Sequence, residues 1–113
     1  MPSSSVLHGT VDILILKTLS WQPMHGYAIS GWISNRSAGA IEVEGAALYQ
    51  ALHRLERRKL VTPEWGVSEN NRRAKYYAIT PEGRKVLRNE SSTWRSYAAA
   101  VAAVLDAPRP GAA

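Results

Sequence analysis

The sequence predicts a mainly helical α+β fold with one small β-hairpin, and two changes in the spacing of apolar residues predict it. Up to Leu60, apolar residues recur at helical spacing in three successive segments. From Val61 to Ile79 they alternate with polar residues, which is the period of a strand. After Pro81 the helical spacing returns and continues to about Leu105. We therefore expect three helices, a hairpin and a long fourth helix within 113 residues.

The composition favours an acidic partner. The formal net charge is +5, and ten of the fourteen Lys and Arg residues fall between His53 and Arg88. Such a cluster points to nucleic acid or to an anionic membrane surface. Cysteine is absent, which excludes disulfides and thiolate metal sites. Because the start of the chain does not resemble a signal peptide and no apolar run could span a bilayer, we expect a cytoplasmic protein that does not enter the membrane.

The first two helices should form the support of the domain. Residues 1–9 contain a proline and three consecutive serines, so we expect a flexible tail there. The first helix should begin at Thr10, with Asp12 in its first turn. It is apolar on nearly every side, so its own domain and a partner subunit should both cover it. The second helix follows Pro23 and carries three apolar residues at helical spacing, Ile29, Trp32 and Ile33.

The third helix, expected over residues 44–60 after a short extended segment at 41–43, carries two different faces. One face is apolar and consists of Leu48, Ala51, Leu52 and Leu55. The side chains of the other face are small at the start of the helix, able to hydrogen-bond in its middle and cationic at its end. This face consists of Ala46, Gln50, His53 and Arg57, with Tyr49 and Arg54 at its margins. That face suits a helix lying in the major groove of DNA. For this helix alone, a solvated face with a chance excess of arginine is the alternative interpretation.

The hairpin is basic. Its tip, residues 68–72, contains two asparagines that tolerate a left-handed backbone, and Arg72, Arg73 and Lys75 flank it. The order helix, helix, helix, hairpin is that of a winged helix-turn-helix, which we place at residues 10–80. In such a domain the third helix would contact base edges, while the hairpin would bring arginine to phosphates or to the adjacent minor groove.

The last helix carries a row of apolar residues typical of a coiled-coil interface, which we call the seam. It should begin at Thr80 and Pro81 as an N-cap and first helical residue, and span residues 81–105. Apolar residues repeat along it every seven positions, in two series that comprise Leu87, Trp94 and Val101, and Tyr97 and Val104. So long a helix cannot bury this stripe against so small a domain, so we expect it to form a homodimer. Residues 106–113 should be a flexible tail.

Three blocks of the sequence resemble the PadR family of bacterial transcriptional regulators. They are HGYAI at 25–29, ALYQALHRLE at 47–56 and RAKYYAITPEG at 73–83, and the resemblance covers residues 7–105. It implies a homodimeric winged-helix repressor that binds a palindromic operator in double-stranded DNA. It also implies frequent release by a small aromatic or drug-like effector. The C-terminal region is of the family's short kind, a single helix.

The resemblance bears on individual residues as well. It suggests that Tyr27 and Tyr49 each donate a hydroxyl to a phosphate, with simple packing as the other role open to them. The chain departs from the family at Ala47, where Ser or Thr is common, and at Gln50, where Pro is common. We therefore expect one phosphate contact and the base contacts to differ from those of the family.

The aromatic residues outside these blocks have two possible roles. In the seam, Trp94 would lie near the twofold axis, where paired indoles could sandwich a planar effector. Packing is the interpretation that we favour for it. The other tryptophans, Trp21, Trp32 and Trp65, are expected in the core.

Other functional classes find little support. The histidines lack the spacing of metal ligands, and there is no nucleophile elbow, P-loop or dinucleotide-binding turn, so we expect no metal, no cofactor and no enzyme. His25 should serve as a hydrogen-bonding residue at a helix start. A dimeric winged-helix module that binds proteins and not DNA is the competing hypothesis, although it leaves the charge of the hairpin unexplained. Glu42 and Glu44 would repel a phosphate and are expected to point away from the groove.

Overall fold

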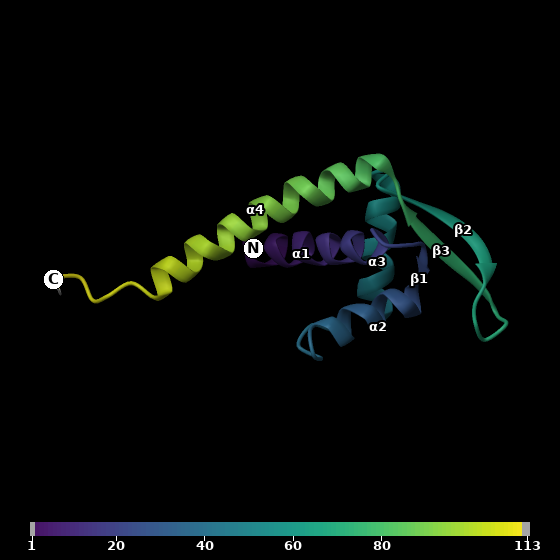
Figure 1. Cartoon of the computed structure of the whole chain (residues 1–113), viewed down its shortest axis with the longest axis horizontal. Coiled ribbons are helices and arrows are strands. Elements are labelled where there is room, and N and C mark those ends of the chain that lie inside the picture. The colour runs from purple at the N-terminus through teal and green to yellow at the C-terminus, as the bar shows by residue number, and fades with distance from the viewer. Residues whose placement is uncertain (1, 112–113) are drawn as a thin grey trace.

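The computed structural model describes residues 2–111, and their side chains from residue 10 onward. Within this part of the chain there are four helices and three strands, in the order α1 (Pro2–Leu19), β1 (Met24–His25), α2 (Gly26–Arg36), α3 (Gly45–Arg57), β2 (Val61–Val67), β3 (Arg73–Ile79) and α4 (Pro81–Leu105). The three helices, hairpin and long last helix that the apolar spacing predicted are confirmed (Figure 1). None of the described helices combines the length and the hydropathy that a membrane span requires.

The sheet is antiparallel and has the strand order β1-β3-β2. The hairpin of β2 and β3 pairs Val61 with Ile79 at its base and Val67 with Arg73 near its tip. At the tip, Asn71 has a φ of 59°, the left-handed conformation that the sequence predicted there. The predicted extended segment at 41–43 is wrong, because these residues form a loop. The strand added to the hairpin is instead β1, whose two residues pair with Tyr76 and Tyr77.

The core lies where α1, α2 and α3 meet the base of the hairpin. The apolar stripe predicted for α3 is confirmed, since Leu48, Ala51, Leu52 and Leu55 are all buried. Around it are packed the other buried apolar residues, Ile15, Leu16, Leu19, Ile29, Ile33, Val43, Leu60, Val61 and Tyr77. Val43 explains the misleading pattern at 41–43, because a loop residue that fills a core position produces the same alternation as a strand.

The start of α1 differs from the expectation. The helix begins at Pro2 and not at Thr10, so residues 2–9 are helical where we expected a flexible tail. Proline is compatible with a first helical turn, because the N–H that it lacks would have no partner within the helix. At the other end, residues 107–110 are irregular, and residues 112 and 113 lie outside the described part of the chain.

Two tryptophans expected in the core are on the surface. Trp21 is 65% exposed and Trp65 is 57% exposed, while Trp32 is half-buried against the core. The hairpin projects past the helices, so within β2 only its first residue, Val61, is buried. Strand periodicity shows which residues share a face, but not where the covering layer ends.

The first turn of α4 is fitted closely to the end of α3. Thr80 is the predicted N-cap, and its Oγ1 accepts from the Gly83 N–H at 2.9 Å and donates to the Lys59 carbonyl at 2.9 Å. A Cβ at Gly83 would overlap the carbonyl oxygen of Leu60. From this anchor α4 runs alongside α1, and its C-terminal part extends beyond the rest of the molecule (Figure 1).

Candidate nucleic-acid interface

The polar face of α3 is open to solvent. Ala46, Gln50, His53 and Arg57 are all exposed, on the side of the helix opposite its buried stripe. Tyr49, at the margin, is 53% exposed, and its hydroxyl lies beside the first residue of α2, at 3.4 Å from where a Cβ on Gly26 would be. Glu42 and Glu44 are exposed as well, and their direction relative to a bound duplex remains a prediction.

A groove of about 650 Å³ separates α3 from the hairpin. It brings together six of the residues proposed from the sequence as DNA contacts, namely Tyr27, Tyr49, His53, Arg72, Arg73 and Lys75. Arg73, Lys75 and Tyr77 alternate along β3, so their side chains lie on one face of the hairpin. His53 and the marginal Tyr49 of α3 therefore border the same hollow as the basic face of the hairpin, whereas Ala46, Gln50 and Arg57 do not line it.

His25 lines this groove at the start of α2. It is the N-cap of α2, and its Nδ1 accepts from the Ala28 N–H at 3.1 Å, which confirms the predicted helix-start role. Its ring packs edge-on against Tyr76, with the centroids 5.3 Å apart, and its Nε2 lies 3.8 Å from a carboxylate oxygen of Glu69. These contacts join the start of α2 to the tip of the hairpin.

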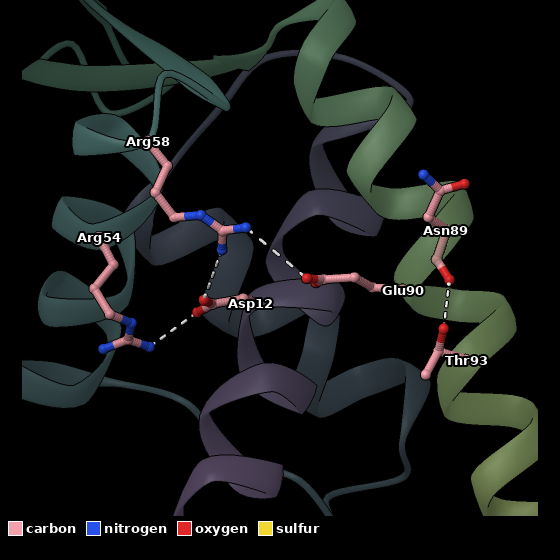
Figure 2. A network of polar contacts seen from close by, with 6 residues as sticks. All are labelled: Asp12, Arg54, Arg58, Asn89, Glu90 and Thr93. Carbon is pink, nitrogen blue, oxygen red and sulfur yellow. Dashed lines mark hydrogen bonds and ion pairs between the residues drawn. The ribbon is translucent and has the colours of Figure 1, made fainter.

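Arg54 is engaged inside the molecule. Its Nη2 donates to Asp12 Oδ1 at 2.9 Å, and the Asp12 side chain is only 9% exposed. Figure 2 shows Arg58 bridging the same carboxylate to Glu90 on α4, with both of its N–O distances at 3.9 Å. This network, Asp12, Arg54, Arg58 and Glu90, ties α1, α3 and α4 together. Arg54 thus has a structural partner that the sequence did not indicate, since the two residues are 42 positions apart.

The cations on the hairpin and at the end of α3 differ in how far other side chains already engage them. The Nζ of Lys75 lies 3.6 Å from Glu56 on α3, which fixes the hairpin to that helix. Arg73 lies over the ring of Trp65, 4.2 Å from its centroid. Among the described residues, no carboxylate forms an ion pair with Arg57 or Arg72, and both side chains are exposed. Those two guanidinium groups are available to an external anion.

Among the groove residues that the sequence analysis did not propose as DNA contacts, Trp65 is the one that it assigned to another place. Trp65 was assigned to the core, yet it lines the groove opposite Lys75 in the β2–β3 ladder. The register of the hairpin puts Trp65 on the face of Lys75, because residues opposite each other across a ladder share a face, and the packing of α3 turns that face into the groove. From the sequence, Trp65 was assigned to the core because it is a large apolar residue.

The seam residues of α4 fall into two groups. Leu87 is partly buried against the core of its own chain. Trp94, Tyr97, Val101 and Val104 are exposed. Trp94 donates from its Nε1 to Thr10 Oγ1 at 3.1 Å and borders a second groove of about 520 Å³ between α1 and α4. Within the described residues, no group of His, Asp or Glu side chains is arranged to hold a metal ion.

The fold and the groove define a class of protein, the winged-helix regulators of transcription. The model of the transcriptional regulator PadR-like family matches residues 15–89, and the chain belongs to that family. This is a family of transcriptional regulators and not a class of enzymes.

The chain is also similar to individual proteins, among them two solved regulators. An uncharacterised protein from Lysinibacillus sphaericus is 31% identical over 94 residues, which cover 83% of this chain and 86% of the relative. A solved transcriptional regulator from Clostridium thermocellum has a TM-score of 0.77 at 31% identity, covering 86% of this chain and 94% of that one. A PadR family regulator from Eggerthella lenta has a TM-score of 0.75 at 32% identity, covering 94% and 93%.

Proposed function

We propose that the chain is a sequence-specific DNA-binding repressor that acts as a homodimer. The observation that carries the proposal is the shared groove, bordered by Tyr49 and His53 of α3 and by the basic face of the hairpin. Gln50 and His53 can exchange hydrogen bonds with base edges in the major groove. Arg57 and Arg72, which have no acidic partner among the described residues, can bind the phosphates on either side.

The homodimer is supported by α4. Its C-terminal part carries the exposed apolar residues Tyr97, Val101 and Val104, in a helix that extends past the domain. An exposed apolar row of this length calls for a partner, and a second copy of the same helix supplies a matching one. Two recognition helices related by a twofold axis would enter successive major grooves, about 10 bp apart, on an inverted repeat.

Repression and its relief form the rest of the proposal. A dimer seated on an operator within a promoter would exclude other proteins from that DNA. The groove between α1 and α4, with Trp94 at its border, is the proposed place for a small aromatic effector. The competing hypothesis, a module that binds proteins alone, gives no role to Arg57 and Arg72, which have no acidic partner among the described residues.

The test is selection of duplexes from a randomised library by the purified protein, followed by anisotropy titrations. We expect an inverted repeat, also present upstream of the protein's own coding region. Gln50→Ala and His53→Ala should change which sequence is preferred. Arg72→Ala should weaken binding to all duplexes alike and lower the salt dependence, because it removes a phosphate contact.

Three results would count against the proposal. The first is the absence of duplex binding, which would favour the protein-interaction module. The second is a selected site without twofold symmetry. The third is a reversal of roles, in which Arg72→Ala alters the preferred sequence while the α3 variants do not.

A further inference from the structure

Trp65 stands on the basic face of the hairpin. It is opposite Lys75 in the ladder, and Val67 is opposite Arg73, so these four side chains share one face. That face borders the groove together with Tyr49 and His53 of α3. An indole that is 57% exposed in this position is not a core residue, and it lies where the proposed duplex would lie.

The contact between Trp65 and Arg73 is the shortest of the cation–aromatic contacts among the described residues. The Arg73 Cζ is 4.2 Å from the ring centroid, against 4.7 Å for Lys17 over Trp21 and 5.5 Å for Lys75 over Tyr77. A guanidinium held over an aromatic ring keeps the N–H groups at its edge available to a phosphate. The indole therefore restrains the cation without occupying its donors.

The thickness of the Trp65–Arg73 pair limits which part of a duplex it can contact. Two stacked planar groups lie about 3.5 Å apart and together are about 7 Å thick. The minor groove is about 6 Å wide, and narrower still in A·T tracts. Arg73 together with the indole beneath it is therefore too thick to enter the minor groove. A phosphate at the edge of the duplex is the anion that Arg73 can reach while it stays on the indole.

We propose that Trp65 is a positioning residue for Arg73, which it holds against a backbone phosphate beside the groove bound by α3. The pair contributes affinity and salt dependence but no sequence preference. This inference rests on the proposed DNA-binding function. If Trp65 were a core residue, or if it contacted bases, its removal would change affinity, salt dependence and sequence preference in a different combination.

The experiment is a double-mutant cycle on DNA binding. Trp65→Ala, Arg73→Ala and the double variant are titrated into a selected inverted repeat and a scrambled duplex of equal length, over a series of salt concentrations. We expect each single variant to weaken binding to both duplexes about three- to tenfold, and the double variant to be little worse than the weaker single one. The salt slope of Trp65→Ala should fall toward that of Arg73→Ala, by about one per protomer.

Two further variants separate positioning from folding. Trp65→Phe keeps an aromatic face and should retain most of the affinity and of the salt slope. Trp21→Ala removes a similarly exposed indole that also has a cation over its ring, but outside the groove, and should leave DNA binding unchanged. Thermal melts of all variants establish that they are folded.

The outcomes are distinct. Losses that add in the double variant, or an unaltered salt slope in Trp65→Ala, overturn the positioning role while the wild type still binds DNA. A loss confined to the selected repeat would make Trp65 a base-contacting residue and would also overturn it. A wild type that binds neither duplex would overturn the proposed function itself.

Discussion

Gly83 shows how a single residue fixes the direction of the long helix. The Thr80 N–H donates to the Leu60 carbonyl at 3.0 Å, which brings the first turn of α4 against the end of α3. A Cβ at Gly83 would overlap that same carbonyl oxygen and approach Ile79. Because the obstacle is backbone, no change of rotamer could relieve it.

We therefore expect Gly83→Ala to lower the free energy of unfolding by about 1–3 kcal/mol, as overpacking of a closed site does. Gly31→Ala is the matched control, since nothing lies within 4 Å of the corresponding Cβ in α2. That change should stabilise the protein by about 0.5–1 kcal/mol through helix propensity. Urea denaturation followed by circular dichroism measures both. Equal effects of the two substitutions would show that the close approach at Gly83 has no energetic consequence.

At the scale of elements, the Asp12 network sets how α3 sits between α1 and α4. A carboxylate that is 9% exposed receives one arginine at 2.9 Å and a second at 3.9 Å, both from the C-terminal end of α3. Removing its charge would leave two guanidinium groups facing a partly desolvated site without an anion. The position of α3, and with it the groove, depends on this carboxylate.

Asp12→Asn is accordingly expected to destabilise the fold by about 1.5–3 kcal/mol, the range for a hydrogen bond to a charged group. Glu90→Gln makes the same chemical change at a site that is 40% exposed, where the distance to Arg58 is 3.9 Å. Its cost should be below about 1 kcal/mol, as for surface ion pairs. Denaturant titrations at neutral pH compare them. Similar small losses for both variants would contradict an anchoring role for Asp12.

Elements also show how far the sequence predicts this structure. The hairpin, the N-cap at Thr80 and the two faces of α3 were predicted correctly, because each depends on residues close together in the chain. Strand β1 was missed, since two residues carry no period and become a strand only by pairing with Tyr76 and Tyr77. The segment at 41–43 was misassigned because its alternation came from one core contact of Val43.

At the scale of the whole molecule, the dominant feature is an elongated shape of 64 × 28 × 26 Å with an unpaired helix end. Leu87 and Val101 both belong to the seam predicted from the sequence, but they are not equally suited to a test of the dimer. Leu87 is unsuitable, because it packs against the core of its own chain and its loss would damage the fold. Val101 and Val104 are exposed and are the better choice.

Replacing Val101 and Val104 together by Glu should convert the proposed dimer into a folded monomer that no longer binds the operator. Charged side chains in the seam would have to be desolvated on association, which opposes it. Sedimentation velocity gives the mass, and anisotropy gives the binding. Val67→Glu is the control, since it adds a charge at a similarly exposed valine on the hairpin and should leave the mass unchanged. An unaltered dimer in the α4 variant would refute the seam.

The sequence by itself determined the helices, the hairpin, the buried stripe of α3 and the exposed row of α4. These features follow from periodicity and capping, which act over a few residues. The tertiary structure alone decided that Trp65 faces the groove, that Arg54 is paired with Asp12 and that His25 meets the hairpin. Each of these depends on contacts between segments distant in the chain, whose geometry is set by how the helices pack. A local sequence pattern does not specify that packing.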